Sequence, residues 1–332
     1  MPLTERKPVQ TAADAWDLRK VRYYLWKIAA GPDSGTPTGA VLKDALSSSG
    51  KLLRPQLLLA FGSMGPEARK HPERMYILAA MVELTHLASL IHDDIVDEAP
   101  SRRGQPSIQS KYGKDAAVYA GDFLISRVVL WGAKEGLLEA VERIARTVEE
   151  MCAGEIGQAA CKFRTDVTTE EYYANIRGKT AALFRTACGM GAAEAGCPGW
   201  VVEKAERFGE ALGLLFQLRD DLLDFTAAGD AVGKETHKDF RDGIYTMPVL
   251  KALQDPWGWN ALLPLMRDNR EWGLNADELA IMEQAVARAG GVEAAWEEVR
   301  RFHRLAGELL DELEAYGSVD GLRRVWCKLG LR

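Results

Sequence analysis

Apolar residues recur at three- and four-residue spacing along most of the chain, and the alternation typical of β-strands is scarce. Residues 73 to 97 contain no glycine or proline and carry apolar side chains along one side, which predicts a long helix. Residues 201 to 225 predict a second long helix. Stretches rich in proline or glycine at 31–39, 65–72, 98–106 and 197–200 predict loops. The pattern therefore predicts an all-α fold.

The composition is that of an ordinary globular protein. Of the 332 residues, 47 % are hydrophobic and 27 % charged, a balance that supports a large core. Nothing in the composition divides the chain, so we expect a single domain over residues 1–332. The net charge of -6 argues against a nucleic-acid partner. The five cysteines form no CxxC pair and are expected to be reduced.

The ends and apolar stretches of the chain bear on its location. The first residues lack the apolar core of a secretory signal, and no later stretch looks long and apolar enough to cross a membrane. We therefore expect a cytoplasmic protein. Residues 16 to 28 mix basic and aromatic side chains at helical spacing, which suits either a first helix packed on protein or an interfacial helix. At most, we expect peripheral contact with a membrane.

Both predicted long helices end in the same acidic motif, DDxxD. Its members are Asp93, Asp94 and Asp97 in the first helix and Asp220, Asp221 and Asp224 in the second. Positions i and i+4 share a helix face, so the outer aspartates of each motif can hold one cation. One such motif is more often a solvated helix end. Two copies on apolar helices favour Mg²⁺, which prefers oxygen ligands and phosphates, and predict a diphosphate bound through metal ions.

Basic residues that suit a diphosphate stand near these motifs. Lys51 and Arg54 precede a predicted helix whose first turn contains Pro55. His86 lies two helical turns before Asp93, on the same face. Taken singly, such residues are more often surface charges or core histidines. Arg102 and Arg103 follow the first motif, and Lys234 follows the second. Lys179 and Thr180, in the segment IRGKTAA, add a further charge and a hydroxyl.

In their order and spacing these segments resemble the trans-isoprenyl (polyprenyl) diphosphate synthase family, of the medium- or long-chain type. The similarity extends from about residue 50 to residue 250. The segments that carry it are GKLLRP at 50–55, HLASLIHDDIVD at 86–97, SRRGQP at 101–106, GD at 121–122, RGKTAALF at 177–184, QLRDDLLD at 217–224 and GKETHKDFRDG at 233–243. The resemblance implies the isoprenoid synthase fold, a single-domain helical bundle around a central apolar cavity.

The resemblance also implies a reaction and the residues that perform it. Isopentenyl diphosphate would condense with an allylic diphosphate by ionisation, condensation and elimination, with the released diphosphate as base. About two to three Mg²⁺ ions per active site are expected on the six aspartates, which with Lys179 form the catalytic set. Isopentenyl diphosphate is expected on Lys51, Arg54, His86 and Arg103. The allylic diphosphate is expected on Arg102, Lys179, Thr180, Gln217 and Lys234.

Two positions after the second motif depart from the family pattern. His237 stands where an inner glycine is usual, and Ile244 stands where a later lysine is usual. We therefore expect one phosphate contact to be lost. Short-chain members usually keep that lysine, so its absence disfavours a short-chain assignment.

Product length is expected to depend on the helix before Asp93. Short-chain relatives place bulky aromatic residues four or five positions before the first aspartate, whereas this chain has Ser89 and Ala88, which let a growing tail pass. Trp131 on a neighbouring helix either closes the cavity or is ordinary core. We predict a product of about six to eight isoprene units, at roughly one unit per 5.4 Å helical turn. The deeper positions are Thr85, Leu84 and Met81.

Three alternatives stay open at this point. The chain could be the catalytic subunit of a heterodimeric prenyl synthase, a short-chain farnesyl or geranylgeranyl diphosphate synthase, or a class I terpene cyclase. A cyclase normally has a second metal site with Asn and Ser or Thr, rather than a second DDxxD. Family members generally form homodimers, which is the state we expect.

Overall fold

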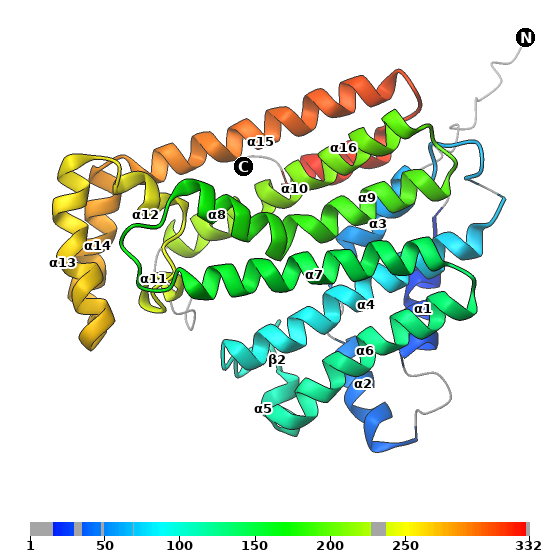
Figure 1. The fold of residues 1–332 in the computed structure, drawn as a ribbon, viewed down its shortest axis with the longest axis horizontal. Coiled ribbons are helices and arrows are strands. Elements are labelled where there is room, and N and C mark those ends of the chain that lie inside the picture. The colour runs from blue at the N-terminus through cyan, green and yellow to red at the C-terminus, as the bar shows by residue number, and fades with distance from the viewer. Residues whose placement is uncertain (1–15, 30–34, 48–49, 69, 227–236, 330–332) are drawn as a thin grey trace, which may run out of the picture. The chain divides into compact units, whose positions relative to one another are not determined.

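The computed structural model describes residues 16–29, 35–47, 50–68, 70–226 and 237–329. Nearly all of these residues are helical (Figure 1), so the all-α expectation is confirmed. The only strands in these ranges are β1 (Ser101–Arg102) and β2 (Gln105–Pro106), which form one hairpin. The helices are α1 (Leu18–Ala29), α2 (Pro37–Ser47), α3 (Leu53–Phe61), α4 (Pro72–Val96), α5 (Ile108–Tyr112), α6 (Lys114–Lys134), α7 (Leu138–Ala160), α8 (Thr169–Ile176), the π-helix η3 (Arg177–Ala181), α9 (Ala182–Glu194), α10 (Gly199–Thr226), α11 (Lys238–Arg241), α12 (Met247–Ala252), α13 (Pro256–Trp272), α14 (Ala276–Arg288), α15 (Gly291–Glu314) and α16 (Asp320–Leu329).

The chain divides into two compact units. Unit 1 comprises the described residues within 1–146, 185–207 and 310–328, and unit 2 comprises those within 147–184, 208–309 and 329–332. The first acidic motif belongs to unit 1 and the second to unit 2. The single domain over 1–332 stays a prediction.

In unit 1, α4 packs against α1, α3 and α6. Met75, Leu78, Val82 and Leu84 are each at most 2 % exposed, and buried apolar side chains occur on all sides of the helix. A helix that is apolar all round is stable only when other elements cover it. Pro72 occupies the first turn, where a proline costs no hydrogen bond. The helix therefore matches the predicted span of 73 to 97 to within a residue at each end.

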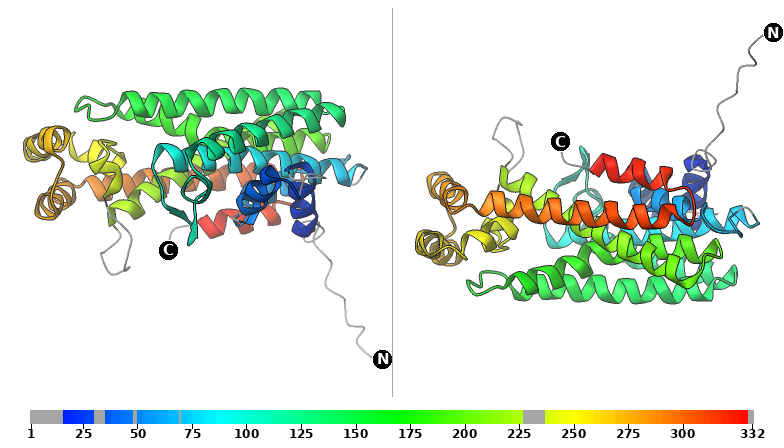
Figure 2. Two further views of the ribbon diagram at one scale, coloured as in Figure 1. Left: turned by 90° about the horizontal axis from the view of Figure 1, so that it is seen from below. Right: turned by 90° about the horizontal axis from the view of Figure 1, so that it is seen from above.

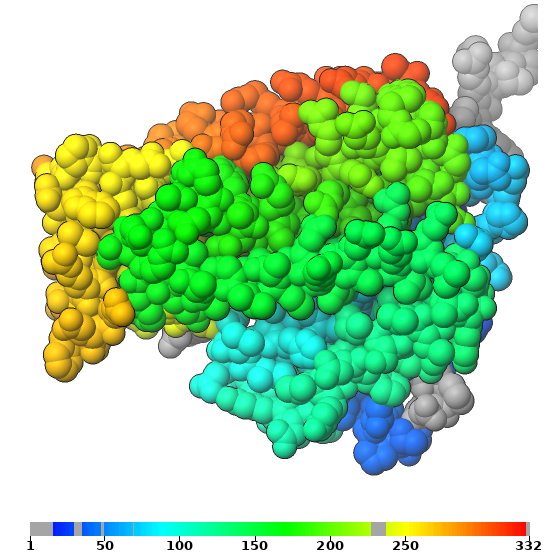
Figure 3. All heavy atoms as spheres, viewed as in Figure 1, coloured from blue at the N-terminus to red at the C-terminus, as the bar shows by residue number. Residues whose placement is uncertain are grey.

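Two helices of unit 1 are long and apolar enough to cross a membrane, so the expectation that no stretch would be is wrong. The apolar window of α4 is 78 % buried within the protein, as in a core helix, whereas that of α6 is only 33 % buried. The exposed apolar residues of α6 include Val118, Tyr119, Val129 and Leu130. Part of α6 is open at the surface in the space-filling view (Figure 3). The helix therefore presents an uncovered apolar face.

In unit 2, side-chain caps set several helix starts. α8 begins with a capping box between Thr168 and Glu171, and α14 begins with one between Asn275 and Glu278. α13 and α14 lie side by side (Figure 2). α8 continues directly into the π-helix η3. Single π-helical turns are rare and are frequently found at functional sites, which draws attention to the residues of this segment.

Candidate active site

The first acidic motif ends α4 in a Schellman motif. The backbone N–H groups of Glu98 and Ala99 donate to carbonyls of the preceding turn, at 3.3 Å and 2.9 Å. Glu98 takes a left-handed conformation, with φ 49°, where glycine is usual. Asp93 and Asp97 are one turn apart at this helix end, and Asp97 is exposed. The two outer carboxylates can therefore bind a shared cation from the helix surface.

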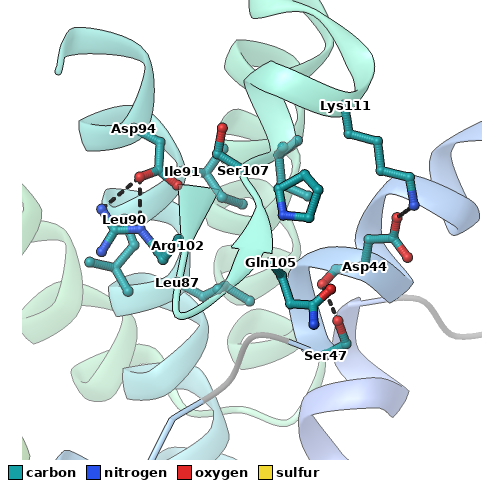
Figure 4. A pocket seen from close by; sticks show the side chains of 12 residues that line it. Asp44, Ser47, Leu87, Leu90, Ile91, Asp94, Arg102, Gln105, Ser107 and Lys111 are labelled. Carbon is teal, nitrogen blue, oxygen red and sulfur yellow. Dashed lines mark hydrogen bonds and ion pairs between the residues drawn. The ribbon is translucent and has the colours of Figure 1, made fainter. Parts of the chain in front are cut away.

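The middle aspartate of the first motif, Asp94, is held by an arginine. It is 3 % exposed, and its Oδ1 accepts hydrogen bonds from Nε of Arg102 at 2.8 Å and from Nη2 at 2.7 Å. Arg102 lies on β1, and the chain turns to β2 through Arg103 and Gly104, both at positive φ, as in a tight hairpin turn. The hairpin therefore places the Arg102 guanidinium against Asp94 near the end of α4 (Figure 4).

A cavity of about 90 Å³ lies beside this ion pair (Figure 4). α4 lines it with Leu87, Leu90 and Ile91. A second ion pair, between Lys111 and Asp44 at 2.5 Å, lies on the other side of the cavity. The cavity is thus bounded by two ion pairs, of which only that of Arg102 includes an aspartate of the motif.

The residues predicted to bind isopentenyl diphosphate gather around Gly50. The Arg103 guanidinium lies so close to Gly50 that an added Cβ would meet Nη1 at 2.5 Å. Nη2 of Arg22, on α1, donates to the Gly50 carbonyl at 3.4 Å. Lys51 and Arg54 follow on the same loop and at the start of α3. Basic side chains from three separate segments therefore meet at one loop.

The charges in this basic cluster are partly buried. Burial raises the pKa of Glu83, one turn before His86, against the attraction of Arg54, Arg103 and Arg22. Burial, followed by the neighbouring arginines, lowers the pKa of His86 well below its usual range, so the imidazole is neutral at neutral pH. Burial also lowers the pKa of Arg54 to about 10. One carboxylate against three guanidinium groups leaves a positive excess that suits an anion.

The second acidic motif lies in the last turns of α10. Asp221 is 4 % exposed, and both of its oxygens accept hydrogen bonds. Oδ2 accepts from the hydroxyl of Tyr172 at 2.5 Å, and Oδ1 accepts from Nε2 of Gln217 at 2.8 Å. The hydroxyl of Thr180 donates to Oε1 of Gln217 at 2.6 Å. The structure therefore joins three predicted residues in one network and adds Tyr172.

A fourth aspartate, Asp239 on α11, joins the second motif. Its backbone N–H donates to the carboxylate of Asp224. Burial, then the charges of Asp221 and Asp224, raises the pKa of Asp239 to about 7, and burial raises the pKa of Asp221 to about 6. A bound cation would relieve this penalty, so the all-oxygen donor set fits Mg²⁺ or Ca²⁺. In the described part of the chain, no three acidic, His or Cys side chains converge on one point, so further ligands are needed.

Lys179 lies on η3 beside α7. Its Nζ donates to Oε1 of Gln158 at 2.9 Å and lies 3.1 Å from a carboxylate oxygen of Glu155. The two helices approach closely because Gly154 has no side chain: a Cβ there would lie 2.5 Å from the Lys179 backbone nitrogen. The Lys179 charge also stabilises the ionised carboxylates of the second motif. The predicted ligand Lys234 lies outside the described residues.

The predicted chain-length residues lie on α4 and α6 of unit 1. Ser89 is half-buried and donates from its hydroxyl to the carbonyl of His86 at 2.8 Å. Trp131 is half-buried and adjoins Gly132, where a Cβ would meet the Met81 methyl group at 2.9 Å. The structure thus places Met81 beside α6, while the central cavity and the chain-length roles stay predictions. The fully buried members of the set are Met81, Leu84, Thr85 and Ala88.

Sequence reasoning alone misses three residues of these clusters: Arg22, Tyr172 and Asp239. Asp239 stands inside the segment GKETHKDFRDG, so that segment contained a signal for it. No motif in the sequence marked Arg22 or Tyr172 as part of these clusters, because they contact Gly50 and Asp221 only in the folded chain. They are 28 and 49 residues away from those partners in the sequence.

The family model for polyprenyl synthetase matches residues 38–271. The chain therefore belongs to the polyprenyl synthetase family. It is 35 % identical over 296 residues to heptaprenyl diphosphate synthase component 2 of Geobacillus stearothermophilus, covering 89 % of this chain and 90 % of that protein. The family and this relative make the chain a prenyltransferase of the prenyl diphosphate synthase class.

Solved structures share its fold. The geranylgeranyl pyrophosphate synthase of Lactobacillus brevis matches with a TM-score of 0.82 and 28 % identity, over 94 % of each chain. The polyprenyl synthase of Caulobacter crescentus, solved with calcium and isoprenyl diphosphate, matches with a TM-score of 0.81 and 26 % identity, over 94 % of this chain and 92 % of that one. These similarities confirm the isoprenoid synthase fold.

Proposed function

We propose that the protein is a magnesium-dependent synthase that adds isopentenyl diphosphate to an allylic diphosphate and makes an all-trans product of medium or long chain. The observation that carries this proposal is the division of roles within each acidic motif. Asp94 and Asp221 are buried and bonded to protein donors, whereas Asp97 and Asp220 are exposed at the helix surface. Outer carboxylates held in this way suit metal ions that bind a diphosphate.

The basic cluster at Gly50 is assigned to isopentenyl diphosphate. Its positive excess supports the binding of an anion, and the neutral imidazole of His86 can donate one N–H to a phosphate oxygen. The residues of this site are Lys51, Arg54, His86 and Arg103. The residues assigned to the allylic diphosphate are Arg102, Lys179, Thr180, Gln217 and Lys234.

Catalysis by this chain rests on charge rather than on a protein nucleophile. Mg²⁺, at roughly two to three ions per site, would supply the polarisation of the diphosphate leaving group. The chain's own part is to orient the carboxylates and the cationic side chains before substrate arrives, as the hydrogen bonds to Asp94 and Asp221 do. The calcium and isoprenyl diphosphate in the Caulobacter crescentus structure support a divalent cation.

Incubation of the purified chain with Mg²⁺, labelled isopentenyl diphosphate and farnesyl diphosphate tests the proposal. We expect a ladder of products that ends near about six to eight isoprene units, as the helical spacing of the buried α4 positions suggests. A product of three or four units would contradict the chain-length proposal alone. The absence of condensation with primers of several lengths would contradict the function.

The Trp131 side chain offers a sharper test of product length. Trp131→Ala should extend the products by about one or two units if the indole closes the tail cavity, since a helical turn of 5.4 Å corresponds to roughly one unit. Trp272→Ala is the control, because Trp272 is 84 % exposed on α13. Unchanged product lengths with Trp131→Ala would remove this residue from the chain-length set.

We also propose that the protein forms a homodimer through the exposed apolar face of α6. A second candidate, the catalytic subunit of a heterodimer, is favoured by the relative named component 2. Light scattering of the wild type and of Leu130→Glu distinguishes the two. A wild-type dimer that Leu130→Glu dissociates supports the homodimer, whereas a monomer active only with a second polypeptide supports the heterodimer. Cell fractionation would test the proposed cytoplasmic location.

A further inference from the structure

His237 precedes α11 in a conformation that its side chain disfavours. Its φ is 60° and its ψ is 29°, in the left-handed region where glycine is the usual residue. The family pattern has glycine here, and the observed conformation explains that preference. The imidazole is nevertheless buried, with 8 % of the residue exposed. A strained residue with a buried polar ring is the kind of outlier from which a function can be inferred.

The two ring nitrogens of His237 have different surroundings. Nε2 lies 3.6 Å from Oε2 of Glu283 on α14. Nδ1 is buried and has no hydrogen-bond partner among the described residues. A carboxylate beside Nε2 favours the tautomer with its proton on that nitrogen, which leaves a lone pair on Nδ1. A buried acceptor without a partner is unfavourable, so Nδ1 is suited to bind a group that accepts its lone pair.

The imidazole lies at the second acidic motif. It contacts Phe225 edge to face, with ring centroids 5.3 Å apart and planes at 71°. Phe225 directly follows Asp224, whose carboxylate accepts the backbone N–H of Asp239, two residues after His237. The imidazole also lies within electrostatic range of the Asp224 carboxylate. His237 therefore places an imidazole near a group of side chains that otherwise offers only oxygen ligands.

We propose that Nδ1 of His237 is a ligand of the divalent cation held by Asp224, a ligand that a glycine at this position cannot supply. This inference rests on the proposed function. A lone pair binds a metal ion, whereas a phosphate oxygen, itself an acceptor, would need a proton on Nδ1. Metal-bound histidines usually direct their other ring nitrogen at a carboxylate or carbonyl, as His237 does toward Glu283.

The proposal has a consequence for metal preference. Mg²⁺ binds oxygen ligands, whereas Co²⁺ stands higher in the series of affinities for sites that contain nitrogen. Calorimetric titration of the metal-free, full-length protein with each metal alone measures the ratio of the Co²⁺ affinity to the Mg²⁺ affinity. This ratio should be about tenfold or more lower in His237→Gly than in the wild type. Glu283→Gln should lower the ratio less. His303→Ala, a change in α15 outside this group, should leave it unchanged.

A spectroscopic readout tests the ligand directly. Pulsed electron paramagnetic resonance of bound Mn²⁺, in protein labelled with ¹⁵N-histidine, should show nitrogen coupling in the wild type and in His303→Ala but not in His237→Gly. Glycine suits the left-handed backbone, so the variant should fold; His237→Asn, which also tolerates this conformation, repeats the test.

An unchanged affinity ratio together with no ¹⁵N coupling in the wild type would overturn the inference. This outcome is distinguishable from failure of the proposed function. If the proposed function failed, the wild type would not condense isopentenyl diphosphate with an allylic diphosphate in the presence of Mg²⁺, with or without nitrogen coupling.

Discussion

The two DDxxD motifs are alike in sequence but differ in how the protein holds the middle aspartate. Asp94 and Asp221 are 3 % and 4 % exposed. Asp94 is paired with the charged guanidinium of Arg102, whereas Asp221 accepts hydrogen bonds from two neutral groups, the Tyr172 hydroxyl and the Gln217 amide. The first motif thus has an internal cation close by.

The second motif keeps more uncompensated negative charge. Burial raises the pKa of Asp221 to about 6, and burial together with the other carboxylates raises that of Asp239 to about 7. Burial at the second motif therefore penalises the ionised form of these carboxylates. We expect the second motif to depend more on a bound cation than the first.

Neutralising an outer aspartate should have the largest effect on activity. Asp97→Asn or Asp224→Asn removes a charge that holds a cation, so kcat should fall about 10²–10³-fold, the usual loss for one electrostatic contributor. Asp94→Asn and Asp221→Asn should lower kcat about tenfold, because an amide oxygen still accepts one of the protein's hydrogen bonds. Steady-state kinetics with both substrates measures this difference. Equal losses for outer and middle positions would contradict the division of roles.

The folding pattern was largely predictable from periodicity. α4 and α10 follow from long segments with helical periodicity and no proline, and the break in helix at 98–106 follows from its turn residues. The two short strands within that break, β1 and β2, were not predicted. The uncovered face of α6 could not be predicted, because periodicity shows which positions are apolar but not which of them are buried by other parts of the chain. The π-helix η3 did not follow either, since a helix-forming pattern does not distinguish it from an α-helix.

The candidate site was predictable to the level of its motifs and not to the level of its contacts. The six aspartates are recognisable from spacing alone. Asp94 and Asp221 differ because Arg102 binds the first and Tyr172 binds the second. Tyr172 is far from Asp221 in the sequence, so this contact could not be predicted. The left-handed conformation of His237 could be anticipated from the glycine that the family pattern has there, but the ring's partner on α14 could not.

The next largest effect should come from the arginine that distinguishes the first motif. Arg102→Lys keeps the charge but loses the guanidinium fork, so KM for the allylic diphosphate should rise about tenfold while KM for isopentenyl diphosphate stays constant. Lys111→Ala is the control, since it breaks the partly exposed pair with Asp44 across the same cavity, and exposed pairs contribute about 0–1 kcal/mol. A similar rise in both variants would assign the effect to the cavity instead.

The excess charge of the second motif should be visible in the stability of the metal-free protein. Because the folded-state pKa of Asp239 is raised from 3.8 to about 7, its contribution to stability is fully present below pH 3.8 and is lost as the pH rises through 7. Asp239→Asn should therefore raise the free energy of unfolding at pH 8 by roughly 2 kcal/mol in chelator. Denaturant titrations at pH 5 and pH 8 measure this gain.

Two comparisons test whether that gain arises from the acidic cluster. Added Mg²⁺ should shrink the difference between Asp239→Asn and the wild type, because the cation compensates the wild-type carboxylates. Asp242→Asn, in the same short segment, should not reproduce the gain. A variant without any gain at pH 8 would show that the second motif is no more dependent on a cation than the first.

The smallest expected effect concerns the Tyr172 hydroxyl, a neutral donor to Asp221 where the first motif has the arginine Arg102. Tyr172→Phe leaves Asp221 with the Gln217 bond alone, and because the Tyr172 hydroxyl lowers the pKa of Asp221, its loss should raise that pKa further. Cation affinity should fall several-fold, corresponding to about 1 kcal/mol for one hydrogen bond. Tyr173→Phe is the matched control, since the Tyr173 hydroxyl donates to Glu298 at 2.8 Å, away from the motif. Calorimetry with Mg²⁺ compares the two, and equal affinities in both variants would mean that the Tyr172 hydroxyl does not tune the second motif.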